Sequence, residues 1–156
     1  MESSSKTIEA IGPSFSLQKF EAARKQAWAM IDKLSAIAEP GMLSENFIEL
    51  LEDPQFFSER EKWWHPIKVR LGKNTQCSFR DKNLEEPRLK LGDLFFFDIG
   101  PVFYGHEADV GQTFCLGDRN FKNPAEEIFK ELKEVWKKEK LTGEALYERG
   151  VQLASS

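Results

Sequence analysis

Apolar residues recur at intervals of three and four in the N-terminal part of the chain, which is the period of a helix with one apolar face. This pattern predicts a helix that begins after Ser14 or Ser16 as N-cap and ends at Pro40 and Gly41. A shorter helix, with the sequence ENFIELLED, follows Ser44 and stops at Pro54. Helices therefore open the ordered part of the chain.

The middle of the chain changes to short apolar runs that are typical of strands. A strand is predicted around Ile67–Leu71, and a polar surface loop leads from there to a turn at Gly92 and Asp93. The run LFFFDIG, residues 94–100, has no polar interruption before its aspartate, so we expect a strand buried on both faces. A second strand, at about 107–116, follows the turn region FYGH and predicts an antiparallel hairpin.

Two more helices are predicted at the C-terminal end, one opened by Asn123 and Pro124 and one after a break at Gly143. Residues 1–13 are rich in serine and without pattern, and we expect a disordered leader there. The expected organisation is therefore a leader at 1–13 and one α+β domain at 14–156, an antiparallel sheet flanked by helices.

Each strand of the predicted hairpin carries an aspartate, Asp98 in the first and Asp109 in the second. A hairpin folded about Phe103 and Tyr104, with Gly105 in the turn, places the two carboxylates opposite each other to within a residue. Neighbouring carboxylates in an apolar sheet repel each other, so a shared proton, a basic side chain or a divalent metal must compensate them. The alternative is that one aspartate only caps a strand end.

Composition limits the classes of function. The chain has 156 residues, of which 40% are hydrophobic and 12% aromatic, enough for a packed core. Its net charge of −4, without a basic stripe, argues against nucleic acid as a partner. No apolar run is long enough to span a bilayer and the N-terminus lacks a signal peptide, so we expect no membrane partner and a cytoplasmic location.

The hairpin segment LKLGDLFFFDIGPVFYGHEADVGQTFCLG resembles the metal-binding hairpin of the creatinase/aminopeptidase group of metallopeptidases, the M24-type enzymes with the pita-bread fold. In that group a Gly-Asp turn is followed by an apolar strand ending in Asp-x-Gly, a turn with glycine, and Asp-x-x-x-Thr. The long first helix ending in Pro-Gly agrees with the group as well. The segment WHPIKVRLGKNT is similar to an Xaa-Pro-aminopeptidase-like subgroup.

The resemblance implies a metallo-aminopeptidase that releases an N-terminal residue from a peptide substrate by means of divalent metal ions, Mn, Co, Zn or Mg. It implies that Asp98 and Asp109 bind the metal, together with one histidine and two glutamates from the second half of the fold. Both histidines, His65 and His106, precede Asp109, and the later glutamates have the helical spacing of a solvated face. We therefore expect the N-terminal half of a pita-bread domain, truncated and weak or inactive as this chain.

Other positions depart from the group's pattern. A substrate-binding histidine is implied about five residues after Asn74, where this chain reads Cys-Ser-Phe-Arg, and Gln112 stands where an arginine often precedes the threonine. His65 is a candidate catalytic residue, with a packed structural role as the alternative, and His106 is expected to be exposed in the turn.

Three interpretations of the whole chain remain open. The first is the peptidase, the second a non-catalytic peptide- or protein-binding module of the same fold, and the third an unrelated α+β domain with an accidental aspartate pair. A half domain would leave a sheet edge uncovered, so we also expect self-association, for example as a homodimer.

Overall fold

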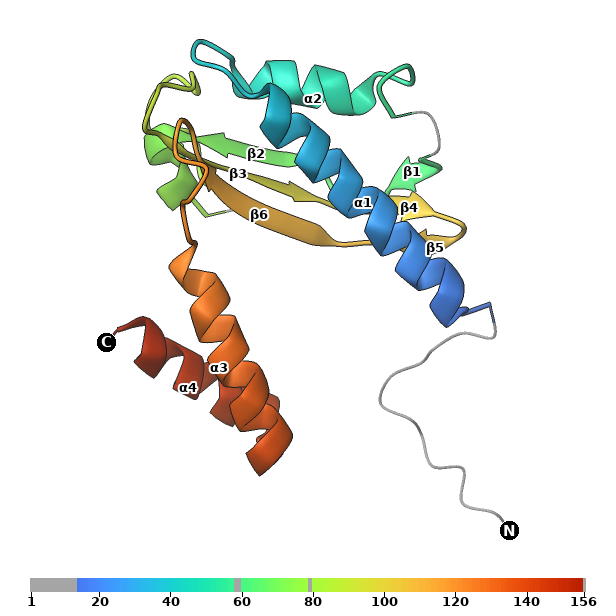
Figure 1. Ribbon diagram of the computed structural model, residues 1–156, viewed down its shortest axis with the longest axis vertical. Helices are drawn as coiled ribbons and strands as arrows, with labels where there is room; N and C mark the ends of the chain where they lie inside the picture. Colours follow the sequence, from blue (N-terminus) through green and yellow to red (C-terminus); the bar gives the residue numbers. More distant parts are fainter. Residues whose placement is uncertain (1–13, 58–59, 79, 156) are drawn as a thin grey trace. The chain divides into compact units, whose positions relative to one another are not determined.

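The computed structural model describes residues 14–57, 60–78 and 80–155, and the predicted leader lies outside them. The chain divides into two compact units, Met1–Gly117 and Asp118–Ser156. The first unit contains two helices and all the strands (Figure 1). Whether residues 14–156 act as one domain stays a prediction.

Helix α1 spans Leu17–Ile37 and begins at the N-cap Ser16, whose side chain accepts a hydrogen bond from the backbone of Lys19. Helix α2 spans Ser44–Glu52. Its N-cap is Leu43 and not the predicted Ser44, because the Asn46 side chain accepts a hydrogen bond from the Leu43 backbone and closes the first turn there. Both predicted helices are confirmed to within a few residues.

Two antiparallel three-stranded sheets follow. The larger one has the order β2-β3-β6, with β2 at Lys68–Leu71, β3 at Leu94–Ile99 and β6 at Val110–Cys115. The smaller one has the order β1-β4-β5, with β1 at Lys62–Trp63, β4 at Pro101–Phe103 and β5 at His106–Glu107. A 3₁₀ turn, η1 at Gly72–Gln76, follows β2. The predicted α+β class is confirmed.

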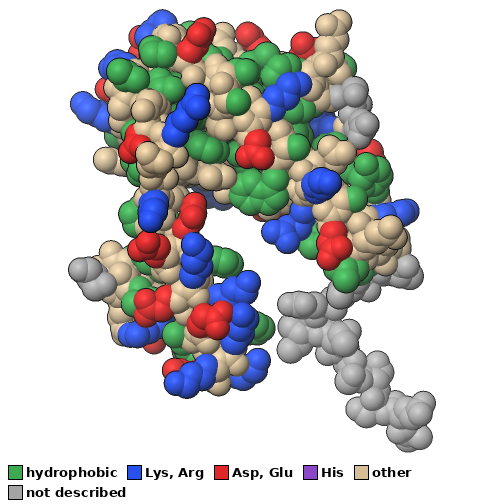
Figure 2. Space-filling model, viewed as in Figure 1, with side chains coloured by type: hydrophobic (Ala, Val, Ile, Leu, Met, Phe, Trp, Pro, Cys, Tyr) green, Lys and Arg blue, Asp and Glu red, His purple; other side chains and the backbone are tan. Residues whose placement is uncertain are grey.

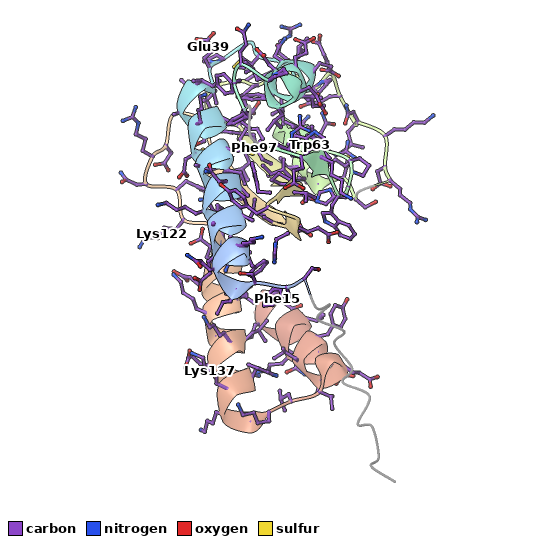
Figure 3. The ribbon with its side chains drawn as sticks, turned by 90° about the vertical axis from the view of Figure 1, so that its right-hand side faces the viewer. Phe15, Glu39, Trp63, Phe97, Lys122 and Lys137 are labelled. Carbon is purple, nitrogen blue, oxygen red and sulfur yellow. The ribbon has the colours of Figure 1, made fainter. Side chains whose placement is uncertain are left out.

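The two faces of the larger sheet differ. Phe95, Phe97 and Ile99 of β3 are buried, and α1 runs across the strands in Figure 1 while α2 packs against β2. Phe97, labelled in Figure 3, meets Phe47 of α2 edge to face, with ring centroids 5.2 Å apart. The side chains that alternate with these three point to the opposite face and are partly exposed, so the prediction that this strand is buried on both faces is wrong.

The hairpin turn lies one residue later than predicted. Tyr104 and Gly105 both have positive φ, 56° and 72°, as a two-residue type I′ turn requires. Phe103 therefore pairs with His106, and the same register continues into the larger sheet, where Asp98 pairs with Gly111. Asp109 is two residues from the position directly opposite Asp98, on the same face of the sheet.

His106 is buried at 8% exposure, so the prediction of an exposed turn residue is wrong. Its Nδ1 lies 2.9 Å from the Tyr104 carbonyl oxygen, and its Nε2 accepts a 2.9 Å hydrogen bond from the Ser16 backbone N–H. The ring also packs against Phe15, with ring centroids 5.6 Å apart. His106 fixes the start of α1 to the hairpin, a contact over ninety residues that the local pattern does not reveal.

The second unit is a pair of helices, α3 at Pro124–Glu139 and α4 at Gly143–Ala154. Asn123 caps α3 and Thr142 caps α4, in each case by a side chain that accepts a backbone N–H. Leu132 lies close to Gly150 where the helices meet, but neither helix has a buried residue, and Trp136 is exposed at 47%. On the face drawn in Figure 2, acidic and basic side chains are interspersed.

Among the described helices, none combines the length and the apolar character that crossing a lipid bilayer requires.

Candidate metal centre

The pairing of the short strand β1 with β4 places His65, two residues after β1, beside the hairpin. Lys62 and Trp63 pair with β4, and the Trp64 backbone N–H extends this pairing by donating to the Gly100 carbonyl at 2.8 Å. The His65 ring then lies directly over Gly100, where a Cβ atom would be only 2.7 Å from His65 Nε2. Glycine at position 100 is therefore what allows the histidine to approach the strand.

Asp98 and Asp109 come from the two sides of the same hairpin. Asp98 lies on β3, and Asp109 directly precedes β6, held between Ala108, whose N–H donates to the Pro101 carbonyl, and Val110, which pairs with Ile99. The two aspartates are diagonal neighbours on the sheet face that α1 and α2 leave uncovered.

The three predicted site residues come together. His65 Nε2 lies 3.4 Å from an Asp109 carboxylate oxygen and 3.8 Å from an Asp98 carboxylate oxygen. One donor atom from each residue lies within 4.8 Å of the others, and among the described residues this is the group of histidine, cysteine and carboxylate side chains with spacing suited to a metal ion. The side chains of Asp98 and Asp109 are 43% and 61% exposed and that of His65 18%, so the group is open to solvent on one side.

The proton on the histidine ring can be placed by its neighbour. His65 Nδ1 lies 2.9 Å from the Pro66 carbonyl oxygen, which can only accept, so Nδ1 carries a hydrogen and donates it. Nε2 is then directed at two carboxylates. The two carboxylates and Nε2 are all electron-rich, so a proton shared among them or a metal cation would relieve their repulsion.

The electrostatics of Asp98 in the metal-free group also favour a nearby positive charge. Loss of solvent raises the pKa of Asp98, and the Asp109 carboxylate raises it further, while His65 and Lys68 lower it. The net pKa is above the usual value for an aspartate. A cation between the carboxylates would relieve both unfavourable effects.

Lys68 is the neighbour that the sequence reasoning missed. It is the register partner of Asp98 across β2 and β3, so the two side chains share a face. Burial and the Arg70 charge lower the pKa of Lys68, and the Asp98 carboxylate opposes this. The signal was present in the segment KVRL, because lysine and arginine alternating with apolar residues share one face of a strand.

The other positions singled out by the resemblance have different outcomes. Phe79, five residues after Asn74, lies outside the described residues, while Asn74 itself is buried and holds the following loop through the backbone of Leu84 and Glu85. Gln112 pairs with Phe97 and lies on the opposite face from Asp98, so a charge there would not face the carboxylates. The glutamates of α3 and α4 are exposed, as predicted.

The sequence profile of metallopeptidase family M24 matches residues 18–154 of this chain. The match includes all three residues of the candidate centre and extends over most of both compact units. No curated protein sequence matches the chain.

Solved structures with a similar fold include the X-Pro aminopeptidase from Thermotoga maritima, with 16% identity and a TM-score of 0.56 over 77% of this chain and 33% of that chain. The prolidase from Pyrococcus horikoshii has 17% identity and a TM-score of 0.63 over 88% of this chain and 40% of that chain. Aminopeptidase P from Escherichia coli with the inhibitor Pro-Leu has 18% identity and a TM-score of 0.56 over 78% and 27%. The likeness confirms the predicted pita-bread-type fold, and the chain spans between 27% and 40% of the length of these structures.

Proposed function

The chain belongs to metallopeptidase family M24, and from that premise we propose that Asp98, Asp109 and His65 form part of the metal centre of an aminopeptidase. The observation that carries the proposal is the convergence of the His65 Nε2 atom and two carboxylates within 4.8 Å on an open face of the sheet. The proposed reaction releases an N-terminal residue from a peptide, with proline in the second position.

The donor set fits a divalent cation. Carboxylate oxygens are hard ligands that suit Mn²⁺, Mg²⁺, Co²⁺ or Zn²⁺. An imidazole nitrogen also suits Mn²⁺, Co²⁺ and Zn²⁺. In this proposal Asp98 and Asp109 hold the metal and His65 presents Nε2 beside it. A bound divalent cation supplies positive charge that polarises a peptide carbonyl and activates water.

The protein residues then have separate roles. Asp98 is fixed by strand pairing and Asp109 by the bonded residues on either side of it, which preorganises the two carboxylates before a substrate binds. The hydrogen bond from His65 Nδ1 to Pro66 fixes the ring and leaves Nε2 to take a proton and return it to the leaving amine. Trp64, exposed at 51% beside His65, offers an apolar surface at the edge of this group.

Activity of the 156-residue chain itself is proposed to be weak or absent. The chain has two histidines, both before Asp109, so the histidine and the two glutamates implied by the resemblance have no assigned positions here. With fewer ligands, the metal is held less tightly and its charge is less well placed for hydrolysis.

Peptide hydrolysis tests this proposal. Release of the first residue from Xaa-Pro and Met-leading peptides is measured with Mn²⁺ or Co²⁺, and we expect binding of metal but no detectable turnover. Metal-dependent turnover that is lost in Asp109→Asn would support the peptidase and contradict inactivity of the chain. Turnover that persists in Asp109→Asn would contradict the site.

The second candidate is a non-catalytic peptide- or protein-binding module. It is favoured by the edge positions of β2 and β6 in the described sheet, each able to pair with another strand. It predicts self-association, which light scattering measures as a mass above that of one chain. A monomer without metal binding would leave neither candidate supported.

A further inference from the structure

Lys68 is the side chain that lies directly opposite Asp98 in the larger sheet. It is the register partner of Asp98 across β2 and β3, and on the β6 side the partner of Asp98 is Gly111, which has no side chain (Figure 1). Directly opposite residues of antiparallel strands have Cβ atoms about 4.5–5.5 Å apart. The Asp98 carboxylate therefore has a lysine on its β2 side and Asp109, diagonally, on its β6 side.

The charge of Lys68 is not stabilised by the fold as a whole. Burial and the Arg70 charge lower the pKa of Lys68, and they outweigh Asp98 and Cys77, which raise it. A lysine held in a favourable ion pair would instead have a raised pKa. The pKa of Asp98 is shifted against its charged form as well. Opposed charges that are both kept in unfavourable surroundings are typical of functional sites.

Lys68 also changes the charge that a metal ion would meet. With the His65 ring neutral, two carboxylates and one ammonium leave a single net negative charge at the centre. A divalent cation would therefore make the centre net positive and not neutral. Excess positive charge helps to polarise a peptide carbonyl, but the lysine that provides it repels the incoming cation.

We infer that Lys68 sets the affinity of the candidate centre for divalent cations, because its ammonium offsets one of the two carboxylates and weakens metal binding. An ammonium group only donates hydrogen bonds, so Lys68 is not a ligand. It is a positioning residue that acts through Asp98. The inference deepens the proposed function and rests on it, since it requires the metal centre.

The test is calorimetric titration of Mn²⁺ into the metal-free 156-residue chain and its variants. Lys68→Gln removes the charge and keeps a hydrogen-bond donor, and it should bind Mn²⁺ about three- to fivefold more tightly, as expected for a nearby, partly screened unit charge. Lys68→Arg keeps the charge and should bind as the original chain does. A merely structural role predicts the opposite direction, so unchanged or weaker binding in Lys68→Gln would overturn the inference.

A second variant, a control and a salt series identify the cause. Lys68→Met should show the same gain as Lys68→Gln, and it decides the test if the Gln variant does not fold. Lys73→Gln removes a charge from a side chain that is 76% exposed and pairs with Glu85, and should change little. The gain should shrink between about 0.01 M and about 1 M salt, as screening shortens from roughly 30 Å to 3 Å. An equal gain in Lys73→Gln, or one independent of salt, would contradict the inference.

A double-mutant cycle on the metal-free chain separates this inference from the proposed function. Lys68→Gln should lower the urea midpoint more, or raise it less, when Asp98 is present than in Asp98→Asn. Absence of this coupling would overturn the inference even if Mn²⁺ binds. Mn²⁺ binding that Lys68→Gln leaves unchanged would reject the inference alone, whereas no Mn²⁺ binding to the original chain would reject the proposed function and this inference with it.

Discussion

At the scale of single residues, the candidate centre brings two carboxylates together, and the neighbouring side chains do not fully compensate their negative charge. Asp98 and Asp109 share a sheet face, and Gly100 lets the His65 ring lie against the strand. Loss of solvent and the Asp109 carboxylate raise the pKa of Asp98, and they outweigh the His65 ring and Lys68, which lower it. The metal-free protein therefore carries unfavourable electrostatics at the residues proposed to bind metal, a common property of functional sites.

This imbalance predicts how stability depends on pH. Since the pKa of Asp98 is raised in the folded protein, its contribution to stability is full in acid below the usual aspartate pKa. That contribution is lost as the pH rises through the raised pKa. Asp98→Asn, which stays neutral, should raise the melting temperature of the metal-free protein at pH 7 and not at low pH.

Thermal denaturation at several pH values in the presence of a chelator measures this effect. The control is Asp32→Asn, at an exposed position of α1, which should show no such pH-dependent gain. A lower melting temperature of Asp98→Asn at pH 7 would mean that the attraction of His65 and Lys68 outweighs desolvation.

At the scale of elements, one two-residue turn sets the register of the whole hairpin. Tyr104 and Gly105 both take left-handed backbone conformations, and pairing continues from Phe103–His106 through Leu94–Cys115. Gly105 adopts such a conformation without strain, but Tyr104, at φ 56°, does not. The register of the hairpin is therefore accompanied by backbone strain at Tyr104 in the turn.

The turn predicts a stabilising substitution. Asn-Gly is the favoured pair in type I′ turns, so Tyr104→Asn should increase the free energy of unfolding by about 0.5–1 kcal/mol. Urea denaturation measures the change, and Tyr104→Phe, which keeps an aromatic ring at the same φ, should leave stability nearly unchanged. An unchanged or lower stability of Tyr104→Asn would contradict the assigned turn.

At the scale of the whole molecule, the sequence predicted the helices and strands better than the register and contacts between them. Apolar periodicity gave α1, α2, β2 and β3 because it is a local property. The partner of Asp98 was misplaced by two residues because a one-residue error in the turn shifts the register by two.

The contacts of the two histidines could not be predicted for a related reason. His65 reaches Asp98 from the segment just after β1 of the other sheet, and His106 is covered by the start of α1, ninety residues away. Both environments depend on packing between distant segments, about which local spacing carries no information. The role of His65, the homodimer and the extent of the domain stay predictions.

Calorimetric titration of Mn²⁺ into the metal-free 156-residue chain tests the central claim most directly. The account predicts saturable binding, weak because few protein ligands are present, that is lost in Asp98→Asn and kept in Asp32→Asn. Saturable heat that Asp98→Asn leaves unchanged, or no saturable binding up to millimolar Mn²⁺, would contradict the proposed centre.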